Sequence, residues 1–77
     1  MIAITRPTGI PLRDWADQVV FELDTYGPFS KLMDDSKWQD WGVQFLAPLG
    51  LGGYNIANPY GFSDWRRWAE RVCGDLA

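Results

Sequence analysis

One short pattern occurs three times in this chain and accounts for all five of its tryptophans. Trp15, Trp41 and Trp68 are each followed by a small residue, and they are spaced 26 and 27 residues apart. A large apolar residue stands three positions before each of them, and another apolar residue stands four positions after. Positions −3, 0 and +4 fall on one face of an α-helix. The pattern therefore predicts three short amphipathic helices that pack together through their tryptophans.

The number of aromatic rings is large for the size of the chain. The 77 residues make one small domain at most, and twelve of them are Trp, Tyr or Phe. A domain of this size buries only about 60% of the surface of its unfolded chain, and each ring can bury roughly 150–250 Å². We therefore expect some rings to stay on the surface, where exposed aromatic patches mark contacts with other molecules.

Helix signals divide the chain into a mainly α fold with an extended arm and a long loop. We expect an N-terminal arm over residues 1–10, whose residues 2–5 favour an extended arm or edge strand. Helices are expected at about 11–25, 36–46 and 63–75, with an apolar, Gly/Pro-rich loop at 47–62. Residues 28–35 are compatible with either a loop or a short helical turn.

Local residue types support the three predicted helix starts. Pro11 suits the first turn of the first helix. Ser36 followed by Gln39 is typical of a capping box at the second helix. Ser63 is a candidate N-cap of the third helix, with Asp64 in its first turn.

The residues that most enzymes and metal sites need are missing. The chain has no histidine, and Cys73 is its only cysteine, so neither a disulfide within the chain nor a Cys/His catalytic pair is possible. The acidic pairs Asp14/Asp17 and Asp34/Asp35 lack the spaced ligands of a calcium loop. We expect no enzyme activity, no cofactor and no bound metal, and we interpret Cys73 as a small buried apolar residue.

The charge and hydropathy patterns exclude other classes of partner. A formal charge of −3 argues against a dedicated nucleic-acid binder. No apolar run approaches the roughly 18–20 residues that cross a membrane, so no membrane partner is expected. No long apolar run precedes Arg6, so the start of the chain does not resemble a secretory signal.

Seven residues are candidates for binding a partner protein. Trp38 and Trp65 add to helix faces that already hold a tryptophan, so they are expected to project partly outward. Arginines beside tryptophans also suit stacking on nucleic-acid bases, but here they flank the apolar stripe, which favours a solvated face or an interface rim. The candidate set is Trp38, Tyr54, Tyr60, Trp65, Arg66, Arg67 and Arg71.

Two segments resemble parts of the small accessory proteins of tailed bacteriophages. They are residues 6–17, which read Arg-Pro-Thr-Gly-Ile-Pro-Leu-Arg-Asp-Trp-Ala-Asp, and residues 58–65, which read Asn-Pro-Tyr-Gly-Phe-Ser-Asp-Trp. The resemblance carries over no catalytic or binding residue. It implies a small subunit of the capsid, neck or tail, present in several copies in the virion, made in the host cytoplasm and packed against larger virion proteins.

Two functions from different classes are therefore expected. The first is a structural or interaction protein, a minor virion component that docks aromatic side chains on larger proteins. The alternative is a small phage-encoded inhibitor that binds and blocks a host enzyme, which a short, acidic, histidine-free chain fits equally well.

Overall fold

A computed structural model describes residues 3–26, 29–49 and 58–76 of the chain, and within these ranges the fold is mainly helical. The described part contains three α-helices, which are α1 (Leu12–Glu22), α2 (Trp38–Leu46) and α3 (Trp65–Leu76). Short 3-10 turns η1 (Asp24–Tyr26), η2 (Asp35–Lys37), η3 (Ala47–Leu49) and η5 (Pro59–Gly61) join or extend them. The expectation of three helices in a mainly α fold is confirmed, and no strand occurs in the described ranges.

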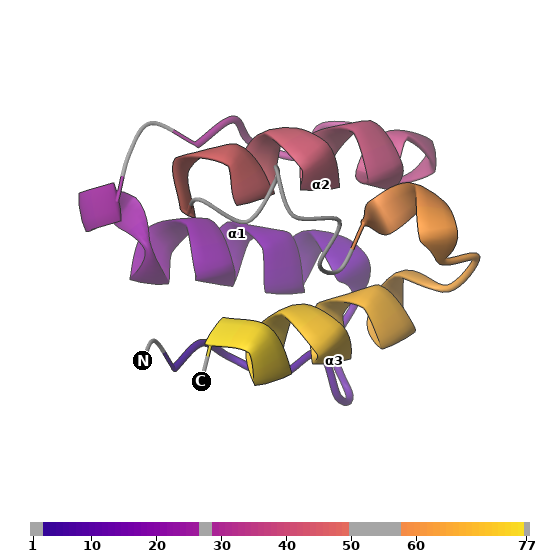
Figure 1. Cartoon of the computed structure of the whole chain (residues 1–77), viewed down its shortest axis with the longest axis horizontal. Coiled ribbons are helices and arrows are strands. Elements are labelled where there is room, and N and C mark those ends of the chain that lie inside the picture. The colour runs from indigo at the N-terminus through magenta and orange to yellow at the C-terminus, as the bar shows by residue number, and fades with distance from the viewer. Residues whose placement is uncertain (1–2, 27–28, 50–57, 77) are drawn as a thin grey trace.

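The three helices run in the same direction, with α1 between α2 and α3 (Figure 1). All of them begin at one end of the molecule, on the right in Figure 1, and end at the other. Between η1 and η2, residues 29–34 run back along the helices toward the end where α2 begins. This parallel arrangement brings the first turns of all three helices to the same end.

The three tryptophans that define the sequence pattern meet in the middle of the core. Trp15 and Trp68 are fully buried and Trp41 is 6% exposed. Their ring centroids form a triangle with sides of 5.7, 6.1 and 6.2 Å, and each pair of rings is edge to face. This geometry suits the quadrupoles of aromatic rings. The threefold pattern in the sequence therefore becomes one indole cluster in space.

A small buried residue follows each of these tryptophans and lets the neighbouring elements approach. Ala16 and Ala69 are almost completely buried, and Gly42 is also buried. A Cβ atom on Gly42 would lie 2.9 Å from Cγ of Pro59 and 3.0 Å from the Trp68 ring. The small residue is therefore needed for packing at the second repeat, where η5 lies against α2.

Each helix begins slightly later than the sequence indicates. Pro11 precedes α1 and accepts the first helical hydrogen bond from Trp15, rather than lying in the first turn. The α3 cap is Asp64, not Ser63, because the Asp64 carboxylate accepts a bond from the Arg66 backbone N–H. Both differences move a helix boundary by one or two residues, which is the spread within which helix ends are commonly assigned.

The predicted capping box at Ser36 is wrong. The Asp34 carboxylate caps η2 by accepting bonds from the backbone N–H and the hydroxyl of Ser36. Gln39 instead turns its amide toward η5, where it donates to the carbonyls of Pro59 and Phe62. A contact distant in the sequence therefore replaces the local one, and η2 carries the chain into α2.

The N-terminal arm lies against α1 and α3. The backbone N–H and hydroxyl of Thr5 both donate to the Glu22 carboxylate, and the Thr5 carbonyl accepts from Nε1 of Trp15 at 2.7 Å. Arg6 forms an ion pair with Glu70 of α3 at 2.9 Å, and Pro7 is fully buried. The arm is therefore extended but packed, and within the described residues it is not an edge strand.

The sequence left open whether residues 28–35 are helical; in the described part, residues 29–34 are not helical and Asp35 begins η2. Leu32 is buried, Phe29 packs against Phe45 with centroids 5.3 Å apart, and the Ser30 carbonyl accepts from Nε1 of Trp41. The predicted loop 47–62 contains η3 and η5 at its ends, and residues 50–57 lie outside the described residues.

Candidate functional site

Four of the seven predicted partner-binding residues belong to elements at the end where the helices begin. Trp38 and Trp65 are the first residues of α2 and α3, Arg66 follows Trp65, and Tyr60 lies in η5 between them. Figure 1 shows these element starts together at one end of the molecule. We name the surface formed by Trp38, Tyr60, Trp65 and Arg66 the helix-start face.

Both tryptophans of the helix-start face are half-buried, because each also packs against the indole cluster. The Trp38 ring lies 5.6 Å from that of Trp68, and the Trp65 ring lies 5.9 Å from that of Trp15. They are therefore attached to a rigid core, and only part of each ring meets solvent. The expectation that these two rings project partly outward agrees with this burial, while their role in binding stays a prediction.

Arg66 is held in place over Trp65. Its guanidinium carbon lies 4.8 Å from the centroid of the Trp65 ring, a cation–π distance. It also donates to the Ile10 carbonyl at 3.0 Å. A fixed guanidinium beside a partly exposed ring is a pre-ordered polar and apolar pair, which loses little side-chain entropy when a partner covers it.

Tyr60 is the most exposed ring of this face, with 56% of its surface in contact with solvent. Its hydroxyl donates to the Asp40 carboxylate of α2. That bond to Asp40 raises the pKa of Tyr60, because a donor next to an anion holds its proton more firmly. The ring is therefore orientated by α2 although it stands on the surface.

The other predicted residues are dispersed. Arg67 is exposed and makes no ion pair or hydrogen bond within the described part of the chain. Arg71 lies one turn further along α3 and forms an ion pair with Asp75 at 3.2 Å. Tyr54 falls outside the described residues. The structure thus places four of the seven residues in elements at one end of the molecule, with Arg67 next to Arg66 in sequence and Arg71 one turn further along α3.

The sequence interpretation missed several exposed apolar side chains. Phe21 and Met33 are 77% and 72% exposed, more than any predicted partner-binding aromatic in the described ranges. Tyr26 and Val43 are half-exposed. The exposure of Phe21 could be predicted from the sequence, because helical spacing places this residue away from the buried stripe of the first predicted helix. Met33 was not, since the conformation of its segment depends on contacts with α1 and α2.

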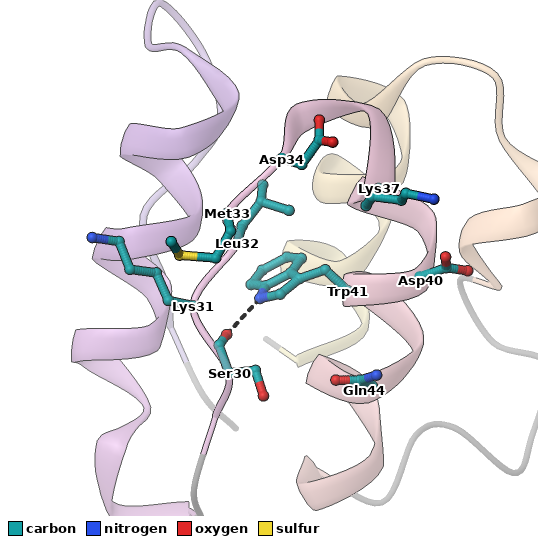
Figure 2. Close-up of a pocket in the computed structure, with 9 residues that line it drawn as sticks. All are labelled: Ser30, Lys31, Leu32, Met33, Asp34, Lys37, Asp40, Trp41 and Gln44. Atoms are coloured by element: carbon teal, nitrogen blue, oxygen red, sulfur yellow. Dashed lines mark hydrogen bonds between the residues drawn. The ribbon is translucent and has the colours of Figure 1, made fainter.

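A shallow pocket lies between residues 30–34 and α2. Its volume is about 350 Å³, and Trp41 forms its wall (Figure 2). Figure 2 shows Lys31 directed toward α1, and Lys37 and Asp40 directed to the opposite side. The Asp34 carboxylate is engaged with Ser36, whose hydroxyl and N–H hold the pKa of Asp34 below its ordinary value. The charged groups do not converge, so the pocket has no set of residues for catalysis.

Cys73 is buried, as the sequence predicts. Burial raises the pKa of the thiol, and its only hydrogen bond within the described residues is a weak one to the Thr5 carbonyl at 3.7 Å. Among the described residues no group of three His, Cys, Asp or Glu side chains is placed to hold a metal ion. The helix-start face itself consists of three aromatic rings and one arginine beside the buried indole cluster.

Comparison of the chain with known proteins gives no match. This holds for the models of known protein families, for curated proteins and for solved structures. In the described part of the chain, no helix has the length and apolar character that crossing a membrane requires.

Proposed function

We propose that this chain is a structural or interaction protein, a minor component of a tailed-phage virion that packs against a larger capsid, neck or tail protein. The observation that carries the proposal is the helix-start face. It contains exposed Tyr60, two half-buried tryptophans, and Arg66, which is held by the Trp65 ring and the Ile10 carbonyl. Aromatic side chains and arginine are the residues most enriched among energetic anchors of protein interfaces.

The rigidity of the face supports a packing role. Its two indoles are extensions of the buried cluster, with ring centroids 5.9 and 5.6 Å from those of Trp15 and Trp68. A subunit that binds with a preformed surface loses less entropy than one that orders on binding. The virion setting itself comes from the resemblance of residues 6–17 and 58–65 to phage accessory proteins. Of these segments, residues 58–65 include Tyr60 and Trp65 of the face.

The experiment measures incorporation into particles. The chain is supplied in cells that are producing the corresponding phage, the virions are purified, and quantitative mass spectrometry gives its copies per particle. We expect a fixed copy number for the wild type. The double variant Tyr60→Arg/Arg67→Glu keeps the core intact and should lower that number severely.

A matched control is Gln44→Arg/Lys31→Glu, which makes the same two charge changes at exposed positions beside the shallow pocket, away from the helix-start face. Circular dichroism checks that all variants remain folded. Normal incorporation of the double variant would contradict the helix-start face as the docking surface. Absence of the wild type from purified particles would contradict the virion role.

The alternative, a small inhibitor of a host enzyme, uses the same face for a different partner. It predicts that the chain is present in infected cells and missing from purified particles. The copy-number measurement therefore separates the two functions even while the partner is unidentified.

A further inference from the structure

The outer side of α1 carries a phenylalanine where an amphipathic helix has polar residues. Phe21 is 77% exposed, the largest value among the exposed large apolar side chains of the described part. It follows fully buried Val19 by two residues, which places it about 200° around the helix axis from Val19. Phe21 therefore stands at the middle of the solvent side, and packing of the chain's own core does not explain it.

Three carboxylates next to Phe21 also have no partner among the described residues. All ten acidic residues of the chain lie in the described ranges, and seven of them bind a group of the chain itself. The carboxylates of Asp14, Asp17 and Asp24 make no hydrogen bond or ion pair with any described residue. The seven engaged pairs are Glu22 with Thr5, Asp34 with Ser36, Asp35 with Arg13, Asp40 with Tyr60, Asp64 with Arg66, Glu70 with Arg6, and Asp75 with Arg71.

Two of the unengaged carboxylates share the side of α1 that carries the exposed ring. Asp14 and Asp17 precede Phe21 by seven and four residues within α1, so they lie on its side of the helix, and Asp24 follows just beyond the helix in η1. Arg13, the only basic residue within α1, is occupied by the Asp35 carboxylate and the Met33 carbonyl. We name the surface formed by Asp14, Asp17, Phe21 and Asp24 the acidic α1 face.

We propose that the acidic α1 face is a second docking surface, which binds a protein partner through an apolar pocket rimmed by lysine or arginine. Phe21 enters the pocket, and the three carboxylates face the basic rim. A large aromatic residue at the centre of a patch with charges around it is the arrangement of an interface anchor. Its negative charge disfavours nucleic acids and anionic lipid surfaces, so the occupant is a protein with complementary charge.

This inference rests on the proposed function only in that the chain acts by binding another protein, and it concerns a different surface. Phe21 lies near the end of α1, whereas the helix-start face is built from the starts of α2 and α3. A chain with two docking surfaces can bind two neighbours in an assembly at once. A chain with a single docking surface binds one neighbour.

The test uses a synthetic amphipathic helix of leucine and lysine as a probe with an apolar stripe and a basic rim. Titration into the full chain is followed by calorimetry and by amide NMR shifts. We expect binding that shifts the amides of α1 and weakens with added salt, since exposed charges are screened. Phe21→Ser should weaken it by about tenfold or more, as truncation of an interface anchor does.

Matched variants separate the acidic α1 face from general attraction to a negative chain. Met33→Ser removes a side chain of similar exposure, and Glu70→Gln/Asp75→Asn removes charge from α3. Both should bind the probe nearly as the wild type does, whereas Asp14→Asn/Asp17→Asn should bind more weakly. A leucine–glutamate helix and vesicles of anionic lipid should not bind.

Four results would overturn the proposal. They are unchanged binding by Phe21→Ser, an equal loss in the Met33→Ser or α3 variants, binding of the anionic vesicles, and a Phe21-dependent dimer in sedimentation, which would make a second copy the occupant. Because the probe needs no virion, none of these results affects the copy-number test of the helix-start face, and failure of that test leaves this one intact.

Discussion

Gly42 of α2 and Pro59 of η5 are in such close contact that no side chain fits between them. A Cβ atom on Gly42 would lie 2.9 Å from Cγ of Pro59, which is fully buried, and 3.0 Å from the Trp68 ring. Neither neighbour is the end of a flexible side chain. The pair therefore fixes η5, and with it Tyr60, against the second helix.

Gly42→Ala should destabilise the protein. Alanine improves helix propensity by about 1 kcal/mol, but overpacking against two rigid buried rings costs about 1–3 kcal/mol. We expect a net loss of up to about 2 kcal/mol in the free energy of unfolding, measured by urea denaturation. The control is Gly74→Ala in α3, where a Cβ meets nothing within 4 Å and the same change should stabilise by up to about 1 kcal/mol. Equal effects at both positions would refute the packing argument.

Trp15→Phe should cost more stability than Trp38→Phe. The Trp15 indole is fully buried and donates to the Thr5 carbonyl at 2.7 Å, and a phenylalanine ring leaves that carbonyl without its indole donor. An unsatisfied polar group costs about 1–3 kcal/mol, in addition to lost ring contacts. Trp38 is half-buried and its indole makes no hydrogen bond with the described residues. Thermal and urea unfolding of the two variants should rank them in this order, and the reverse order would contradict it.

The bond between the arm and α1 should make stability depend on pH in the acid range. Partial burial raises the pKa of Glu22, but the bonds from Thr5 and Gln18 outweigh it, so the pKa is lowered from 4.5. A lowered folded-state pKa stabilises the fold fully above the unfolded-state pKa, and this contribution disappears as pH falls through the folded-state value.

Thr5→Val removes the hydroxyl donor and should therefore reduce the loss of stability on acidification below about pH 4.5, the ordinary pKa of this glutamate. Urea unfolding at a series of pH values gives the slope of the unfolding free energy against pH for the wild type and for Thr5→Val. Thr25→Val is the control, because Thr25 is exposed and its hydroxyl makes no hydrogen bond with the described residues. A slope in Thr5→Val as steep as that of the wild type would show that the arm does not hold Glu22.

Cys73 should react with a disulfide reagent only when the fold opens. The thiol is 6% exposed, and burial, followed by the charge of Glu70, raises its pKa, so little reactive thiolate is accessible in the folded state. We expect labelling more than about a hundredfold slower than in the unfolded chain. An exposed cysteine placed by Ser63→Cys in a Cys73→Ala background should react at nearly the unfolded rate. Fast labelling of Cys73 in the native protein would contradict its burial.

Helical periodicity was enough to predict the three helices and their buried tryptophans, because these depend on residues three and four positions apart. The same local signals placed the helix starts within a few residues, and they failed where a distant group competed. Gln39 illustrates this, since its amide bonds the carbonyls of Pro59 and Phe62 rather than the start of its own helix.

Part of the candidate site could also be predicted. Trp38 and Trp65 were singled out as surplus rings on faces already filled, and they are half-buried on the edge of the indole cluster. The expectation that surplus aromatic area contacts a partner stays a prediction, and the most exposed aromatic ring in the described part belongs to Phe21, which is not among the candidate residues.

The sequence by itself determined which residues lie inward, since a buried stripe repeats with the period of the helix. Only the tertiary structure decided which residues are neighbours. The parallel course of the helices brings Trp38, Tyr60 and Trp65 to one end, and ion pairing across the chain leaves Asp14, Asp17 and Asp24 without partners in the described ranges. Both outcomes depend on contacts between segments far apart in sequence, which local periodicity does not encode.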